Sequence, residues 1–94
     1  MNGKITLDRD TFKVLSSDTR IDILKRISEH KLTLSDLAKD MGMSPSTIKE
    51  HLDRLVEAGL IEHLERDTKW KYYVLTGKGK SIVSPVESRV WILL

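Results

Sequence analysis

The chain has 94 residues, a length that suits a single hydrophobic core, so we expect one domain over residues 1–94. It contains no cysteine, which excludes disulfides, thiolate metal sites and cysteine nucleophiles. Sixteen basic residues against fourteen acidic ones leave a net charge of +2, so the total charge does not by itself identify a nucleic-acid binder.

The first third of the chain predicts two helices after a short β-prone segment at residues 5–7. Asp8 suits the N-cap of a short helix that carries Phe12 and Leu15. A Ser-Ser-Asp run at 16–18 then offers caps for a longer helix over 19–30. The apolar residues of that second helix recur at helical spacing and predict its buried face: Ile21, Ile23, Leu24 and Ile27.

Two further helices are predicted with a very short connection between them. Thr33 and Asp36 form a capping-box pattern at the start of one helix, which we expect to end at Gly42. Ser44 and Pro45 mark the start of the next helix, which runs to residue 58. The expected buried faces are apolar: Leu37, Ala38, Met41, Ile48, Leu52, Leu55 and Val56. A connection this short that contains a glycine is typical of a helix-turn-helix.

After Gly59 the apolar period changes from helical to alternating. This change predicts a β-hairpin with strands over 60–66 and 70–75 and a turn at 67–69. Helices followed by a hairpin give the order of a winged helix-turn-helix, in which the hairpin is the wing.

The end of the chain has weaker signals. Thr76 can cap a last short helix, which Gly77 and Gly79 weaken. Residues 89–94 are β-branched and aromatic enough for a final strand, with residues 5–7 as its natural partner. The predicted fold class is therefore α+β, a winged helix-turn-helix of three to four helices, a β-hairpin wing and short terminal strands.

Several segments match one known family together, although each alone would be weak. They are residues 15–24 (LSSDTRIDIL), 34–38 (LSDLA), 43–55 (MSPSTIKEHLDRL), 57–61 (EAGLI) and 70–76 (WKYYVLT). The joint pattern resembles the ArsR (arsenic-repressor-like) family over residues 12–80. The resemblance implies a DNA-binding transcriptional regulator, usually a homodimer. It would place the second helix of the helix-turn-helix in the major groove and the hairpin on the backbone or minor groove, and we expect it to repress by occluding a promoter.

The outward face of the helix over 45–58 holds the first set of candidate DNA contacts. Seven polar residues at its start, outward face and flanks form this set: Ser44, Ser46, Thr47, Lys49, Glu50, His51 and Arg54. Hydroxyl and basic side chains can contact phosphates or base edges, and Glu50 can accept from cytosine but repels phosphates. The family often has a basic residue in place of Glu50, so an unusual sequence preference is expected. The competing interpretation is an ordinary solvated helix face.

The second set lies on the wing. Residues 66–80 hold five basic side chains (Arg66, Lys69, Lys71, Lys78 and Lys80) against the single acid Asp67. We expect Arg66, Lys69 and Lys71 to contact DNA phosphates. Alternatively, these lysines protect an exposed strand edge from pairing with other chains. The aromatic residues of the hairpin are expected in the core rather than stacked on bases: Trp70, Tyr72 and Tyr73.

No metal, cofactor or catalytic site is expected. Where many ArsR relatives carry metal-binding cysteines, this chain has Thr33 and Ser35. His30, His51 and His63 lack the spacing that would place metal ligands on one helical face. The chain also lacks a nucleophile, base and orienter set and a phosphate-binding loop, so we expect no enzyme activity. The effector of such a regulator cannot be named from these residues.

Partners and location complete the expectations. The resemblance implies a homodimer, and the apolar and aromatic residues near both termini, which exceed what a small core needs, favour it too: Ile5, Leu7, Val90, Trp91, Ile92 and Leu94. The sequence has no apolar run near the roughly 20 residues of a membrane helix and no signal peptide, so we expect a cytoplasmic protein. The alternative function is a winged-helix module that binds only protein, because several acids dilute the basic field: Glu50, Asp53, Glu57, Glu62 and Glu65.

Overall fold

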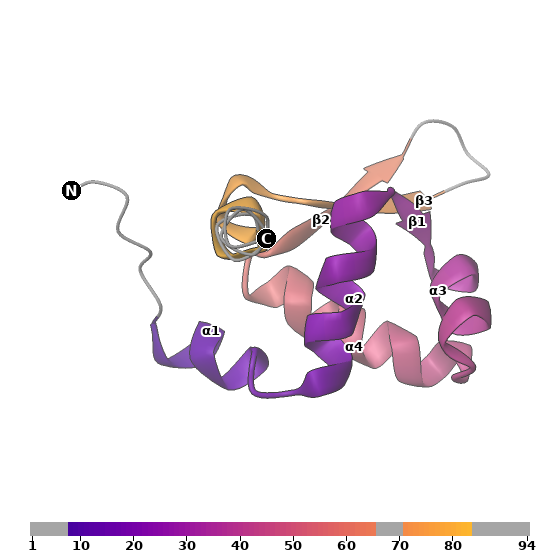
Figure 1. Cartoon of the computed structure of the whole chain (residues 1–94), viewed down its shortest axis with the longest axis horizontal. Coiled ribbons are helices and arrows are strands. Elements are labelled where there is room, and N and C mark those ends of the chain that lie inside the picture. The colour runs from indigo at the N-terminus through magenta and orange to yellow at the C-terminus, as the bar shows by residue number, and fades with distance from the viewer. Residues whose placement is uncertain (1–7, 66–70, 84–94) are drawn as a thin grey trace, which may run out of the picture.

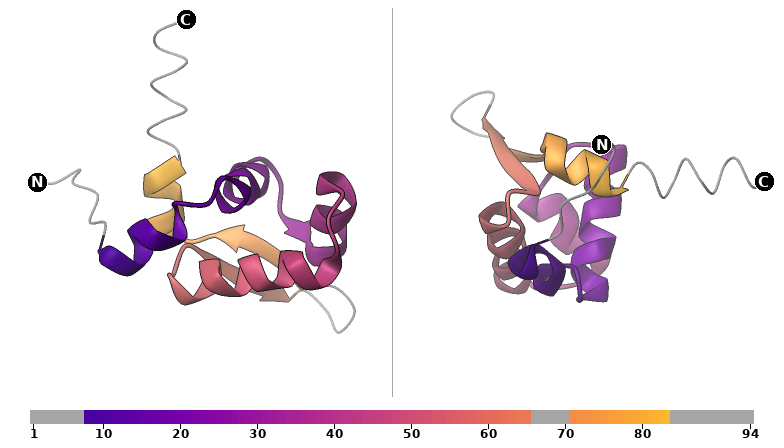
Figure 2. Two further views of the ribbon diagram at one scale, coloured as in Figure 1. Left: turned by 90° about the horizontal axis from the view of Figure 1, so that it is seen from below. Right: turned by 90° about the vertical axis from the view of Figure 1, so that its left-hand side faces the viewer.

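The computed structural model of the chain describes residues 8–65 and 71–83 (Figure 1). Its elements are α1 (Arg9–Val14), α2 (Asp18–Glu29), β1 (Leu32–Thr33), α3 (Leu34–Met41), α4 (Pro45–Glu57), β2 (Ile61–Glu65) and β3 (Lys71–Leu75), followed by a helix over residues 77–83. The sheet packs against α2 and α4, and α3 packs on α4 (Figure 2). The described residues thus hold five helices, one more than the three to four expected, because the segment after Thr76 does form a helix.

The helix ends lie where the local capping residues predict them. The Asp8 carboxylate accepts from the Thr11 backbone N–H at 2.8 Å, and this hydrogen bond lowers the pKa of Asp8. Thr33 and Asp36 form the full capping box, with reciprocal backbone-to-side-chain bonds of 3.0 and 3.1 Å. Gly42 ends α3 at a φ of 65°, a left-handed conformation that glycine adopts without a steric penalty.

The sheet has three antiparallel strands in the order β1-β3-β2. Strands β2 and β3 are in register from the pair Ile61 and Leu75 to the pair Glu65 and Lys71, which confirms the hairpin. Strand β1 was not predicted from the sequence. Its two residues are too few for an alternating pattern, and its partner Tyr73 lies about forty positions away along the chain.

One hydrophobic core joins the helices to the sheet. Its fully buried members come from α2, α3, α4 and the hairpin: Ile23, Leu24, Leu37, Ile48, Leu52, Leu55, Leu60 and Ile61. The helical spacing predicted Ile21, Met41 and Val56 to be buried, but all three are only half-buried. Met41 and Val56 pack against the edge of the core. Phe12 of α1 is 68% exposed, so the first helix does not bury its aromatic ring within the described residues.

The helix over residues 77–83 is fixed to the end of α4. The Thr76 hydroxyl accepts from the Gly79 backbone N–H at 3.1 Å and donates to the Gly59 carbonyl at 2.6 Å. Gly79 is buried directly against the Leu60 carbonyl oxygen, and a Cβ at this position would collide with that oxygen. Glycine is therefore needed at position 79 for close packing, although it weakens the helix locally.

Lys78 is a structural residue and does not lie on the wing, so its grouping with the wing cations was wrong. Its ammonium donates to the Thr11 hydroxyl and to the Ala58 carbonyl oxygen, each at 2.8 Å. Lys80 is exposed on the same helix. The basic residues of the segment 66–80 are therefore not all on the hairpin, because Lys78 and Lys80 belong to the helix over residues 77–83.

Three expectations fall outside the described residues. They are the paired terminal strands at 5–7 and 89–94, the hairpin turn at 67–69, and the positions of Arg66, Lys69 and Trp70. Among the helices that the structure describes, none has the length and apolar character needed to cross a bilayer.

Candidate nucleic-acid interface

The N-terminus of α4 gathers three hydroxyl groups. Ser44 is the N-cap, and its Oγ accepts from the Thr47 backbone N–H at 3.2 Å and donates to the Thr47 hydroxyl at 2.8 Å. The Ser46 hydroxyl lies 3.3 Å from the Ser44 hydroxyl. Pro45 occupies the first helical position, where its missing N–H removes no helix bond. This hydroxyl cluster, Ser44, Ser46 and Thr47, therefore sits at the positive end of the helix dipole, where anions are favoured.

The exposed face beyond the cluster carries mixed charge. The Lys49 ammonium lies 3.2 and 3.0 Å from the two carboxylate oxygens of Asp53, and this hydrogen bond and the Asp53 charge raise the pKa of Lys49. Arg54 Nη1 lies 3.7 Å from a Glu57 oxygen. The Lys49 and Arg54 side chains are 62% and 55% exposed, and solvent strongly screens exposed ion pairs of this kind. A phosphate can therefore displace either carboxylate at little cost.

A shallow hollow of about 410 Å³ runs along this face of α4. Glu50 and Asp53 line it together with Ser46, Thr47 and Lys49. Glu50 is exposed, and its position opposite the buried Ile48–Leu52 side of the helix agrees with the predicted outward face. Among base edges, a carboxylate here can accept only from groups that donate, such as the cytosine amino group.

His51 lies differently from the other predicted contacts. It is half-buried, and its Nδ1 accepts a hydrogen bond from Arg20 Nε at 3.1 Å. An accepting Nδ1 requires the neutral ring with its proton on Nε2. Arg20 also donates through Nη1 to the Val14 carbonyl at 3.2 Å, so one guanidinium joins α1, α2 and α4. Arg20 is not among the residues of the predicted buried face of this helix, and no local signal identifies partners so distant in sequence.

The hairpin contributes one described candidate, Lys71. It is exposed at the start of β3 and stands in register with Glu65 of β2. Tyr73 is buried with 4% exposure, which confirms its predicted place in the core, and burial raises the pKa of its hydroxyl. Tyr72 is half-buried, with the Lys31 ammonium 5.7 Å from its ring centre. In residues 8–65 and 71–83, no group of three or more His, Cys, Asp or Glu side chains is placed to hold a metal ion.

A family model described as "Bacterial regulatory protein, arsR family" matches residues 17–63, from the cap of α2 into β2. The matched segment is half of the chain and includes both helices of the helix-turn-helix. The chain belongs to the arsR family. The resemblance seen in the sequence is thereby confirmed.

Relatives and solved structures agree with this assignment. A protein of Halobacterium salinarum, provisionally named as the arsenical resistance operon repressor ArsR2, is 31% identical over 68 residues, which are 70% of this chain and 56% of the relative. The chain thus spans little more than half the length of that curated relative. A crystal structure of a possible transcriptional regulator for arsenical resistance superposes with a TM-score of 0.70 at 27% identity, covering 89% of this chain and 86% of that one.

A third similar protein confirms the fold. It is the homodimeric winged helix-turn-helix DNA-binding domain of Mb0332 from Mycobacterium bovis, a possible ArsR-family regulator. Its TM-score is 0.69 at 23% identity, over 89% of this chain and 74% of that one. The α+β winged helix-turn-helix predicted from the sequence is therefore confirmed, with α3 and α4 as its helix-turn-helix and β2 and β3 as the wing.

Proposed function

We propose that this arsR-family chain binds double-stranded DNA and regulates transcription, with α4 in the major groove and the hairpin on the backbone or minor groove. The observation that carries this proposal is the N-terminal half of α4. It presents the hydroxyl cluster with Lys49 and Glu50 outward, while Ile48 and Leu52 are fully buried on the opposite side. A recognition helix uses its N-terminal residues in this way in helix-turn-helix proteins.

The contacts are expected to divide into two kinds. The hydroxyl cluster and Lys49 meet phosphates at the positive end of α4, and Arg54 and Glu50 reach base edges further along the helix. On the wing, Lys71 and the neighbouring basic residues Arg66 and Lys69 neutralise phosphates. His51 contributes through its Nε2–H, since its Nδ1 is bonded to Arg20.

A homodimeric repressor is the form that we infer for the whole protein. The Mb0332 domain is homodimeric, and the Halobacterium relative has a repressor's name. Phe12, 68% exposed on α1, leaves an apolar ring for a second copy to cover. Two copies would set their recognition helices about 34 Å apart, one turn of the duplex. A cytoplasmic location and the absence of catalysis fit the same role.

Fluorescence anisotropy with a random-sequence duplex tests the proposal. Binding should weaken by about 10³-fold or more between 50 and 200 mM salt if six or more phosphates are neutralised. The double variant Lys69→Glu with Lys71→Glu should lose most of this binding. Lys25→Glu with Lys39→Glu, on the exposed surfaces of α2 and α3, is the control that changes the net charge by the same amount. A folded protein that does not bind at the lower salt concentration would contradict the proposal and favour a protein-interaction module.

A further inference from the structure

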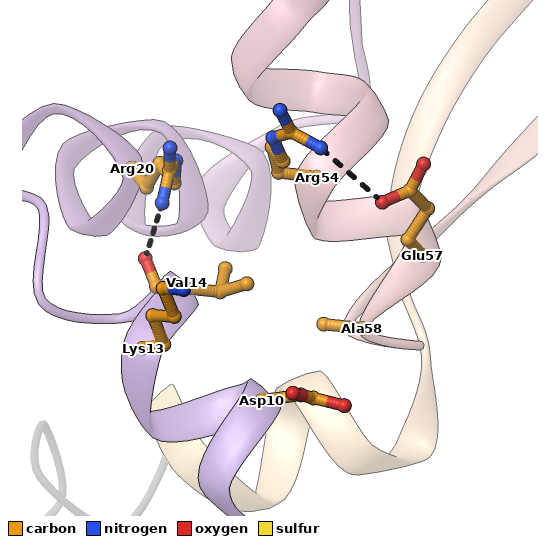
Figure 3. Close-up of a pocket in the computed structure, with 7 residues that line it drawn as sticks. All are labelled: Asp10, Lys13, Val14, Arg20, Arg54, Glu57 and Ala58. Atoms are coloured by element: carbon orange, nitrogen blue, oxygen red, sulfur yellow. Dashed lines mark hydrogen bonds and ion pairs between the residues drawn. The ribbon is translucent and has the colours of Figure 1, made fainter.

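A second hollow lies between α1, α2 and the C-terminal end of α4, away from the hydroxyl cluster (Figure 3). Its volume is about 520 Å³, a size that accommodates a small molecule. In Figure 3, Val14 and Ala58 project into the space from facing walls, and the guanidinium groups of Arg20 and Arg54 lie along one side. Of the residues that line it, the DNA-binding role proposed above uses only Arg54.

Arg20 is held in place before any ligand arrives. It is half-buried, and it donates to His51 Nδ1 at 3.1 Å and to the Val14 carbonyl oxygen at 3.2 Å. These two bonds use two of the five N–H donors of a guanidinium group. Because the Arg20 side chain is already ordered, it loses less conformational entropy when an anion binds to its remaining donors than a free arginine side chain would.

Arg54 is the adaptable partner of this pair. Its Nη1 lies 3.7 Å from Glu57, and the two side chains are 55% and 69% exposed. That separation exceeds a good hydrogen bond, and an exposed pair of this kind is weak. The Arg54 guanidinium can therefore turn toward an anion beside Arg20, and two guanidinium groups suit the paired oxygens of a carboxylate or phosphate.

The full charge of the lining limits what can bind. Lys13, Arg20 and Arg54 face Asp10 and Glu57, so three cations oppose two carboxylates and the net charge is +1. A polyanion would meet repulsion from both carboxylates. A ligand with one anionic group and an apolar body fits the arginine side and the Val14–Ala58 walls at the same time.

We propose that this hollow binds a single oxyanion group between Arg20 and Arg54, with the apolar part of the ligand against Val14 and Ala58. Two sources share this chemistry, a small organic carboxylate or phosphate and a backbone phosphate of bound DNA with its sugar. Binding of the first kind requires no duplex. Its test therefore does not depend on whether the chain binds DNA.

The first arm of the experiment uses the DNA-free protein and phenyl phosphate. NMR signals of the Arg20 and Arg54 Nε–H groups should shift in a saturable way. The exposed substitution Arg54→Gln should weaken binding about tenfold, as expected for the loss of a charge-assisted contact. Arg26→Gln is the matched control, because Arg26 lies on the same helix as Arg20, pairs with Asp22 and does not line the hollow. Circular dichroism confirms that each variant is folded.

The second arm adds a short DNA duplex in place of phenyl phosphate. Saturable shifts of the Arg20 Nε–H and of the Val14 and Ala58 signals with the duplex, but not with phenyl phosphate, would support the site and identify a backbone phosphate as its occupant. A shift of Arg54 alone reflects its expected base contact and would count against the site. The proposal is overturned if neither probe moves these signals. It is also overturned if Arg26→Gln weakens binding as much as Arg54→Gln, or if neutral benzyl alcohol binds as tightly as phenyl phosphate.

Discussion

Ser44→Asp tests the two roles of Ser44 separately: the N-cap of α4 and the proposed contact with a DNA phosphate. Asp is as good an N-cap as Ser, and a negative charge suits the positive end of a helix. In the structure the Ser44 hydroxyl accepts from the Thr47 backbone N–H and donates to the Thr47 hydroxyl. A carboxylate at position 44 can accept from the same N–H, and the Thr47 hydroxyl can rotate to donate to it. The free energy of unfolding should therefore change by less than about 0.5 kcal/mol.

The affinity for DNA, unlike the stability, should fall in this variant. A unit charge about 4 Å from a phosphate costs about 1 kcal/mol in water, so one phosphate near Ser44 predicts roughly a five- to tenfold loss of affinity per protomer. The assay is duplex anisotropy beside urea unfolding. Ser81→Asp is the control, because it adds the same charge on the helix over 77–83, toward the opposite end of the fold (Figures 1 and 2). Equal affinities for Ser44→Asp and the wild type would refute the phosphate contact.

Three further predictions concern stability. Lys78→Met should lower the free energy of unfolding by about 1–3 kcal/mol, because two charge-assisted hydrogen bonds are lost. The control Lys80→Met, at an exposed position of the same helix, should change it little. Equal effects of the two substitutions in urea titration would contradict the structural role of Lys78. Gly79→Ala should lower the melting temperature because its Cβ meets a backbone oxygen, whereas Gly77→Ala has open space and should be neutral or stabilising. Burial raises the pKa of Tyr73, so the stability that depends on its neutral hydroxyl is complete below pH about 10 and is lost as the pH rises through the folded-state pKa. Tyr73→Phe should show a smaller alkaline loss in chemical unfolding.

The helix boundaries could be predicted because their causes are local. Thr33 and Asp36 satisfy each other's backbone N–H groups within one turn, and Gly42 adopts the left-handed conformation at the end of the same helix. Ser44 and Pro45 define the start of α4 in the same way. Such signals depend on a few neighbouring residues, and a single sequence contains them in full.

The features that sequence analysis missed depend on distant partners. The Arg20 bond to His51 spans 31 positions, and the Lys78 bond to Thr11 spans 67. Strand β1 exists only because β3 lies beside it. Helical spacing identifies which face of α2 is wet, but it cannot show that an arginine on that face is enclosed by two other helices. The hollow beside Arg20 could not be predicted from the sequence for the same reason, since its lining comes from three different helices.

The most direct test of the central claim is NMR mapping of the chain during titration with a short DNA duplex. The account predicts that the largest amide shifts cluster at residues 44–54 of α4 and on the hairpin, with much smaller shifts on the exposed surface of α3 around Lys39 and on the helix over 77–83. Shifts absent from residues 44–54 while the duplex binds elsewhere would contradict the assignment of α4 as the recognition helix.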